Sequence, residues 1–161
     1  MPKWVLAGIF ALVALAPIAA GAADPEVKVT DVAGRWTGAS YWEKGHGNLT
    51  LDIVACGDGW CGIKVEPGDT CGGTALKVGA GSIDEGTIRF EGTLELAPGT
   101  EAYTVHVAVF SPEESKPRGL QVTGDTGGEF RAFRRSFPFE AALFRVQDAV
   151  CHAPQTVSAL R

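Results

Sequence analysis

The sequence predicts an all-β domain, folded as an antiparallel up-and-down barrel of about eight strands and fastened by disulfide bonds. Three observations lead to this prediction. Apolar and polar residues alternate with a period of two, which is typical of strands that bury one face. The 21 glycines and 9 prolines interrupt these runs at short intervals, as the turns between short strands do. The four cysteines all lie after residue 50, within the part of the chain that we expect to fold.

The first 22 residues have the three-part order of a cleavable secretory signal. Lys3 supplies a positive charge, residues 4–16 form an uncharged apolar run, and Ala20-Gly21-Ala22 matches the small-residue cleavage motif. Cleavage there leaves a single domain, residues 23–161. The alternative is an uncleaved membrane anchor, because the uncharged segment is long enough to span a bilayer. The small residues before the cleavage position favour the signal, so we expect a periplasmic or secreted protein without a stable membrane anchor.

Removal of this leader leaves 139 residues with 13 basic and 19 acidic side chains, a net charge of −6. Proteins that bind nucleic acid generally present a basic surface, so this composition argues against a nucleic-acid partner. The remaining length suffices for one domain with a hydrophobic core. The predicted partner is a small apolar ligand or an envelope protein, and no cofactor is expected.

The four cysteines, Cys56, Cys61, Cys71 and Cys151, predict two disulfides, because an even number in an exported protein favours pairing. Three pairings are possible, and we favour Cys56–Cys61 with Cys71–Cys151. The first pair flanks a Gly-rich turn, and the second closes a loop of ~80 residues, worth about 4 kcal/mol in the chain-entropy model. Strand parity is an objection to the first pair, because Cys56 continues a polar row and Cys61 an apolar one, so a bulge or the Gly-rich turn has to shift one strand by a residue. The spacing fits neither a zinc site nor haem attachment.

Seven strands follow directly from the alternation. They are residues 35–42, 49–53, 63–65, 75–78, 87–96, 103–109 and 120–122. Residues 139–150 fit either a helical face or a strand face. We favour a strand, because seven antiparallel strands with one apolar face each are best closed by an eighth. The apolar rows are expected to face one shared interior, and a β-sandwich is the competing architecture.

Gly34-Arg35-Trp36 opens the first predicted strand, and Arg145 lies near the end of the last. This pattern resembles the lipocalin and calycin barrels, in which a Gly-x-Trp motif begins the first strand. The resemblance implies that the guanidinium of Arg145 packs over the ring of Trp36 and closes one end of the barrel.

The segment Cys56-Gly57-Asp58-Gly59-Trp60-Cys61-Gly62 is similar to the Cys-Gly…Cys-Gly segment of small exported bacterial domains of unknown function with a calycin-like barrel. Residues 120–124 and 142–145 resemble the closing strands of that family, and the likeness covers most of 33–146. Residues 67–73 and 129–138 depart from the family pattern. Because the family has no known reaction, the resemblance implies a fold and an exported location.

No motif in the sequence predicts catalysis, and we expect that the protein is not an enzyme. His46, His106 and His152 are too widely spaced to build a metal site. The sequence has no Gly-x-Ser-x-Gly nucleophile motif, and every cysteine has an expected disulfide partner. The acidic pairs Asp84-Glu85 and Glu113-Glu114 fall in predicted turns, where carboxylates are solvated rather than enclosed in a site that separates their pKa values.

The leading functional prediction is non-enzymatic binding of a small apolar or amphipathic ligand in the barrel or at its mouth. The candidate residues are aromatic side chains of the barrel and two arginines from a stretch rich in Phe and Arg. They are Trp36, Trp42, Trp60, Phe90, Tyr103, Arg134 and Arg135. The predicted lining of the interior adds Ile88, Leu94, Val105 and Val107. An eight-stranded barrel can also be filled by its own side chains.

The alternative function is a proteinaceous inhibitor of a secreted or envelope hydrolase, either a protease or lysozyme. Its contact segment is expected to be the N-terminal arm, residues 24–32, or the loop around Arg134-Arg135. A structural envelope protein without a ligand is a third, weaker prediction.

Overall fold

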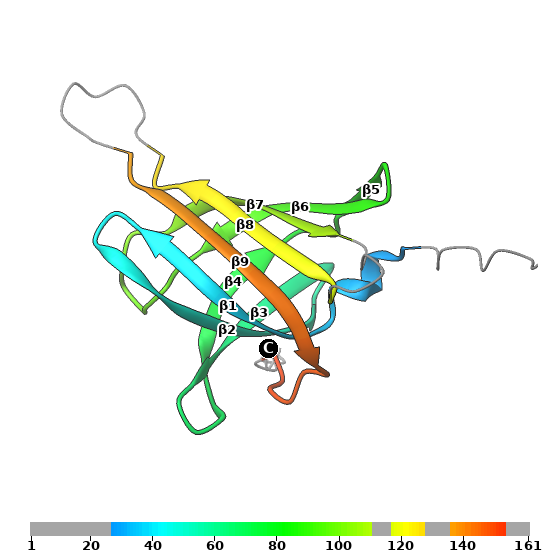
Figure 1. Cartoon of the computed structure of the whole chain (residues 1–161), viewed down its shortest axis with the longest axis horizontal. Helices are drawn as coiled ribbons and strands as arrows, with labels where there is room; N and C mark the ends of the chain where they lie inside the picture. Colours follow the sequence, from blue (N-terminus) through cyan, green and yellow to red (C-terminus); the bar gives the residue numbers. More distant parts are fainter. Residues whose placement is uncertain (1–26, 111–116, 128–135, 154–161) are drawn as a thin grey trace, which may run out of the picture.

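Nine strands and one short 3-10 helix make up the computed structural model, which describes residues 27–110, 117–127 and 136–153 (Figure 1). The elements, in chain order, are η1 (Val29–Val32), β1 (Gly34–Trp42), β2 (Gly45–Cys56), β3 (Gly59–Glu66), β4 (Thr70–Val78), β5 (Ser82–Asp84), β6 (Thr87–Leu94), β7 (Tyr103–Phe110), β8 (Gly119–Asp125) and β9 (Pro138–Gln147). The predicted signal, residues 1–22, lies outside the described residues.

Eight of these strands form a closed antiparallel barrel. Strands β1 to β4 and β6 to β9 pair with their neighbours in the chain, and β9 pairs with β1. The ring is completed by direct pairing of β4 with β6. The short strand β5 pairs only with β6 and lies outside the ring. This confirms the up-and-down barrel and excludes the sandwich. The ambiguous segment 139–150 is a strand as far as Gln147, because its apolar residues alternate with a period of two against β1 and β8.

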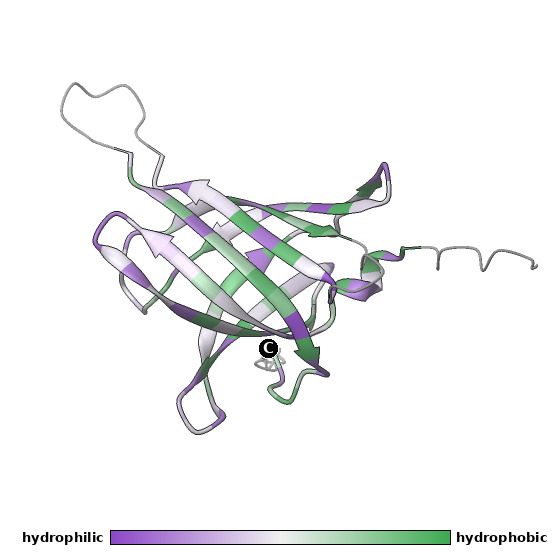
Figure 2. Ribbon diagram, viewed as in Figure 1, coloured by the Kyte–Doolittle hydropathy of each residue, from purple (hydrophilic) through white to green (hydrophobic). Residues whose placement is uncertain are grey.

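The side chains of the barrel fill its interior. Hydrophobic and hydrophilic residues alternate along the strands (Figure 2), and the inward rows join into one core cluster. Six side chains that were predicted to line the interior expose 2% or less of their surface; they are Trp36, Ile88, Phe90, Leu94, Val105 and Val107. Because walls of an open cavity keep uncovered surface, these values show that the barrel is packed solid along these rows.

The helix η1 closes one end of the barrel. Val32 is buried, and its carbonyl oxygen accepts a hydrogen bond of 2.8 Å from the indole Nε1 of the fully buried Trp36. A buried indole N–H needs such a partner, so this bond fixes the helix over the first strand.

The apolar row of β3 faces outward, which corrects the expectation that every apolar row lines one interior. Ile63 pairs with Asp52 rather than with the inward Leu51 or Ile53, and directly paired residues share a face of a sheet. Its place inside is taken by Gly62, where an added Cβ would come within 2.8 Å of Leu76. The glycine therefore lets larger side chains of neighbouring strands fill the space.

Both predicted disulfides are confirmed, Cys56–Cys61 and Cys71–Cys151. The parity objection to the first is resolved without a bulge between β2 and β3. Cys61 pairs with Val54, two residues before Cys56, so both cysteines lie on the outward face and meet diagonally across the hairpin. Disulfides are typical of proteins in an oxidising compartment such as the periplasm or the extracellular space.

The second disulfide holds the C-terminal tail over this outward row. Cys151 is buried against Cys61 and Ile63, and Val54, Cys56 and Val65 pack around them. The tail thereby makes a small second core on the outside of the barrel, which keeps an apolar strip out of water.

A buried ion pair anchors the same tail. Asp52 is fully buried; its carboxylate accepts hydrogen bonds from Arg35 at 2.7 and 3.0 Å, and from the amides of Val150 and Cys151 at 2.9 and 2.8 Å. Arg35 also pairs with Asp69 in the β3–β4 turn. Among the described residues, no buried side-chain nitrogen or oxygen lacks a hydrogen-bond partner, which is the condition for a buried ion pair to be tolerated.

Candidate binding sites at the two ends of the barrel

The structure separates the aromatic residues that the sequence nominated for ligand binding. Trp36 and Phe90 belong to the packed core, so a ligand can reach them only by displacing core side chains. Trp42 and Tyr103 lie together at one end of the barrel. Trp60 is the second residue of β3, at the opposite end, and is paired with Ala55 and Val78. Arg134 and Arg135 lie outside the described residues.

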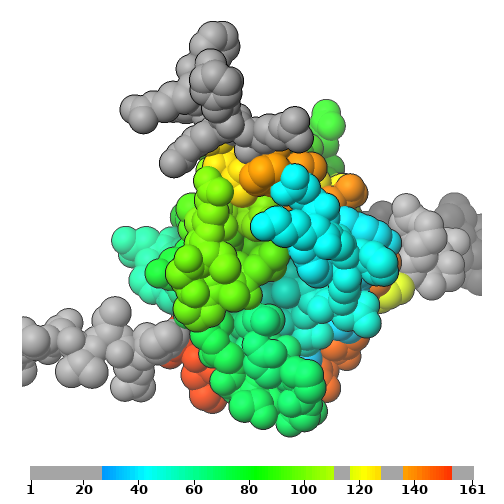
Figure 3. Space-filling model, turned by 90° about the vertical axis from the view of Figure 1, so that its left-hand side faces the viewer, coloured from blue at the N-terminus to red at the C-terminus, as the bar shows by residue number. Residues whose placement is uncertain are grey.

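The end that holds Trp42 and Tyr103 has a hollow of about 270 Å³, which we name the Trp42 mouth. Its walls are the apolar and aromatic side chains of Trp42, Leu96, Tyr103 and Phe137, and its rim is polar. The rim consists of Glu43, Lys44, Thr100, Glu101 and Thr126. Figure 3 looks onto this end, where the β1–β2 hairpin (cyan) lies beside the segment that joins β6 to β7 (yellow-green).

Two glycines of β2 leave room for the indole ring of Trp42. A Cβ added at Gly47 would approach the ring to 3.2 Å, and one at Gly45 to 3.7 Å. The ring therefore lies against bare backbone of its own hairpin, which fixes its orientation at the mouth.

Tyr103 forms the floor of the mouth. Its ring packs against that of the buried Phe139, with centroids 5.2 Å apart. Burial raises the pKa of the Tyr103 phenol above its ordinary value, and the negative charges of Glu43 and Glu101 raise it further. The hydroxyl therefore stays protonated at neutral pH and offers both a donor and an acceptor to a ligand.

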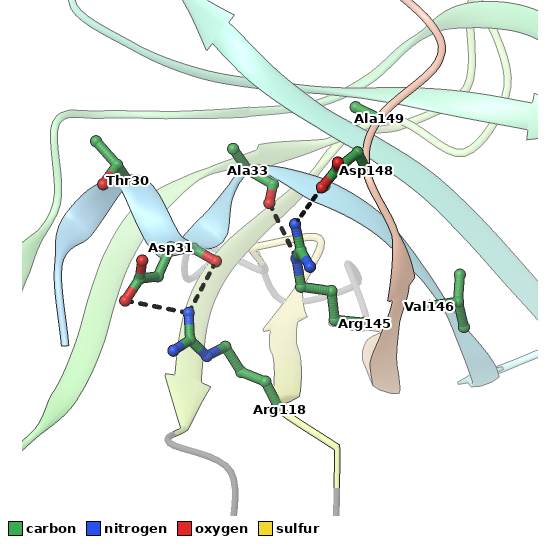
Figure 4. Close-up of a pocket in the computed structure, with 9 residues that line it drawn as sticks. Thr30, Asp31, Ala33, Arg118, Arg145, Val146, Asp148 and Ala149 are labelled. Atoms are coloured by element: carbon green, nitrogen blue, oxygen red, sulfur yellow. Dashed lines mark hydrogen bonds and ion pairs between the residues drawn. The ribbon is translucent and has the colours of Figure 1, made fainter. Parts of the chain in front are cut away.

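The opposite end has a larger hollow of about 670 Å³, which we name the arginine hollow. Two guanidinium groups lie in it, those of Arg118 and Arg145 (Figure 4). The other lining residues come from η1 and the residues that follow it, from the end of β9 and from the tail. They are Thr30, Asp31, Ala33, Gly34, Val146, Asp148 and Ala149.

The guanidinium of Arg145 lies against Gly34, where an added Cβ would come within 2.7 Å of its Nε. That Nε donates to the carbonyl oxygen of Ala33 at 3.3 Å. Within the described ranges, the structure shows no cation–π contact between Arg145 and Trp36. Arg145 thus lies at the η1 end of the barrel, as the family resemblance implies, but the described contacts bind it to backbone and carboxylate oxygens.

No family model, curated protein or solved structure matches this chain. The resemblance to exported calycin-like domains therefore stays a prediction, and the barrel fold rests on the structure alone.

The histidines lie apart from both hollows. His106 is on the outer face of β7, 3.5 Å from Glu91, and His46 lies near Tyr41 on the β1–β2 hairpin. In the part of the chain that the structure describes, no helix has the length and apolar character needed to cross a bilayer.

The sequence prediction missed Arg118 as a site residue, together with the rim of the Trp42 mouth. Arg118 lies far along the chain from most of the aromatic residues predicted to bind the ligand, and it belongs to no motif. Only its position one residue before β8, beside the end of β9, brings it next to Arg145. The one signal in the sequence that could have drawn attention to Arg118 is that basic residues are fewer than acidic ones in this chain.

Proposed function

We propose that the protein is a non-enzymatic binding protein of the periplasm or extracellular space, and that it binds a small amphipathic ligand at the Trp42 mouth. The observation that carries the proposal is the combination of aromatic walls, Trp42 and Tyr103, with a charged rim, above inward rows whose described side chains pack into one core. An apolar group can lie between the rings while a polar group meets the rim, which is the usual composition of a small-molecule site.

The size of the mouth limits the ligand. Its volume of about 270 Å³ is near the lower end of small-molecule sites, which span roughly 300–1,000 Å³. The ligand is therefore smaller than a typical drug molecule. The non-enzymatic role rests on the sequence, which carries no catalytic motif, and the exported location rests on the predicted signal together with the two disulfides.

Titration of the purified protein with the neutral fluorophore N-phenyl-1-naphthylamine tests the proposal. We expect saturable binding to one site per chain, and competition by 1-octanol. Replacement Trp42→Ala removes one aromatic wall, and we expect it to weaken binding about tenfold or more, since each factor of ten corresponds to about 1.4 kcal/mol and a buried aromatic side chain contributes at least that much.

Tyr41→Ala is the matched control. Tyr41 is the neighbour of Trp42 on the same strand, but its side chain points outward and is 56% exposed. It should leave the affinity unchanged. Equal losses in both variants, or an affinity that survives Trp42→Ala, contradict the assignment of the ligand to the mouth.

The contacts of the N-terminal arm do not favour the inhibitor alternative. Within the described part of this arm, Val27 and Val29 pack against the core, and Asp31 forms an ion pair with Arg118 at 3.1 Å. These residues are held on the barrel rather than presented to the cleft of a hydrolase. The other expected contact segment, around Arg134-Arg135, lies outside the described residues, and we advance no second function.

A further inference from the structure

Arg118 and Arg145 are neighbours across the end of the β8–β9 ladder, where the amide of Arg145 donates to the carbonyl oxygen of Arg118 at 3.1 Å. Like charges at adjacent cross-strand positions destabilise a sheet. The chain has more acidic than basic residues, yet two of its arginines lie side by side at one hollow. Strand pairing alone does not explain this placement.

Both guanidinium groups are partly sunk in the arginine hollow. The side chain of Arg118 is 20% exposed and that of Arg145 is 37% exposed. Gly34 makes the room for Arg145, because any Cβ at this position would collide with the guanidinium. The hollow remains open beside them, with a volume of about 670 Å³.

The two arginines form ion pairs that differ in how exposed the partner carboxylate is. Arg118 pairs with Asp31 of η1 through Nη1, at 3.1 Å from the carboxylate and 3.4 Å from the carbonyl oxygen. Arg145 pairs through Nη2 with Asp148 at 2.7 Å, but the Asp148 side chain is 94% exposed. An exposed ion pair contributes little free energy, so a free anion can take the place of the Asp148 carboxylate.

We propose that the arginine hollow is a binding site for a small oxyanion with two negative charges, such as a phosphate or a dicarboxylate. A guanidinium presents five N–H donors in a planar fork that matches two oxygens of such a group. Arg145 uses Nε and Nη2 with described partners, and Arg118 uses Nη1; the remaining edges provide the donors for the ligand. This site lies at the opposite end of the barrel from the Trp42 mouth and does not depend on it.

Calorimetric titration of the oxidised protein with inorganic phosphate and with succinate at low ionic strength tests the site. We expect saturable binding of at least one of them, weakened tenfold or more by Arg145→Gln and by Arg118→Gln. Arg89→Gln is the control, because Arg89 lies on β6, exposed and paired only loosely with Asp84 at 3.5 Å; it should leave binding unchanged. Arg145→Lys keeps the charge without the planar fork, and we expect it to bind more weakly than the unaltered protein while remaining folded.

Replacement Asp148→Asn separates ligand binding from a purely structural clamp. Because Asp148 competes with the ligand for Arg145, its removal should tighten anion binding several-fold. If the arginines serve only to hold η1 and the tail in place, this replacement leaves anion affinity absent or lower. The proposal is overturned if neither phosphate nor succinate binds saturably, or if binding persists in both glutamine variants.

The anion can be free in solution or can be the headgroup of a lipid. Cosedimentation with vesicles that contain phosphatidic acid, whose phosphomonoester can carry two negative charges, compared with vesicles of phosphatidylcholine alone, distinguishes the two. Sedimentation with the anionic vesicles only, lost in Arg145→Gln, identifies a headgroup as the source. Binding of phosphate or succinate without any sedimentation identifies a free anion.

Discussion

Replacement Asp52→Ala is expected to destabilise the protein by about 3–5 kcal/mol, which lowers Tm by roughly 10–20 °C in a domain of this size. The carboxylate has no exposed surface and binds Arg35 and two amides of the tail. Its removal leaves the guanidinium buried with one remaining carboxylate, that of Asp69, and leaves both amides without their acceptor. Urea unfolding of the two proteins measures the difference.

The same ion pair makes stability depend on pH. Burial raises the pKa of Asp52, but the hydrogen bonds from Arg35, Cys151 and Val150 outweigh this effect, so the pKa lies below its ordinary value. A carboxyl group with a lowered pKa in the folded state stabilises the protein above its unfolded pKa of about 4, and this contribution is lost as the pH falls through the folded value. The acid-dependent loss should therefore be smaller in Asp52→Ala.

Asp84→Ala is the matched control for Asp52→Ala. Asp84 also pairs with an arginine, Arg89, but both side chains are more than half exposed, and such pairs contribute at most about 1 kcal/mol. A loss in Asp52→Ala no larger than that in Asp84→Ala means that Asp52 does not anchor the tail.

The double replacement Cys71→Ser with Cys151→Ser is expected to cost about 4–5 kcal/mol of unfolding free energy. The two cysteines are 80 residues apart in the chain, and the entropy that a cross-link removes from the unfolded state grows with the length of the loop. The tail also loses its hold over Ile63 and the rest of the outward apolar row. Denaturant unfolding under oxidising conditions measures the loss.

The other disulfide provides the comparison for this prediction. Cys56 and Cys61 are only 5 residues apart, so the double serine replacement there should cost about 2 kcal/mol in the same model. The long-range pair should thus be the more important by about a factor of two. The reverse order would mean that chain entropy and tail packing do not determine the contribution of the long-range bond.

Most of the fold could be predicted from the sequence, because a period of two tells which residues share a face and the turn residues tell where a strand ends. The alternation does not tell which face is inside. For this reason the outward row around Ile63 was assigned to the interior, and the parity of Cys56 and Cys61 was expected to need a bulge or a shift in the Gly-rich turn. The position of Cys151 near the C-terminus was the one sequence signal that the tail folds back and covers the outer face of β3.

The candidate sites were harder to predict than the fold. Asp52 alternates with leucine and isoleucine and has the pattern of a solvated residue; its burial depends on a tail that arrives from about 100 residues away. Trp42 and Tyr103 were nominated as aromatic residues, but their juxtaposition depends on the closure of the barrel. Arg118 meets Arg145 through the register of the β8–β9 ladder; the family resemblance marked Arg145, but no motif marked Arg118.

The three tryptophans that follow the predicted signal, Trp36, Trp42 and Trp60, provide the most direct test of a packed barrel that binds its ligand at one end. Each contributes one indole N–H signal to a spectrum of protein labelled with ¹⁵N-tryptophan. On titration with N-phenyl-1-naphthylamine, the signal of Trp42 should shift with a saturable dependence, while those of Trp36, in the core, and Trp60, at the far end, stay in place. A shift of the Trp36 signal with none at Trp42 would show that the ligand enters the interior, and would contradict the account.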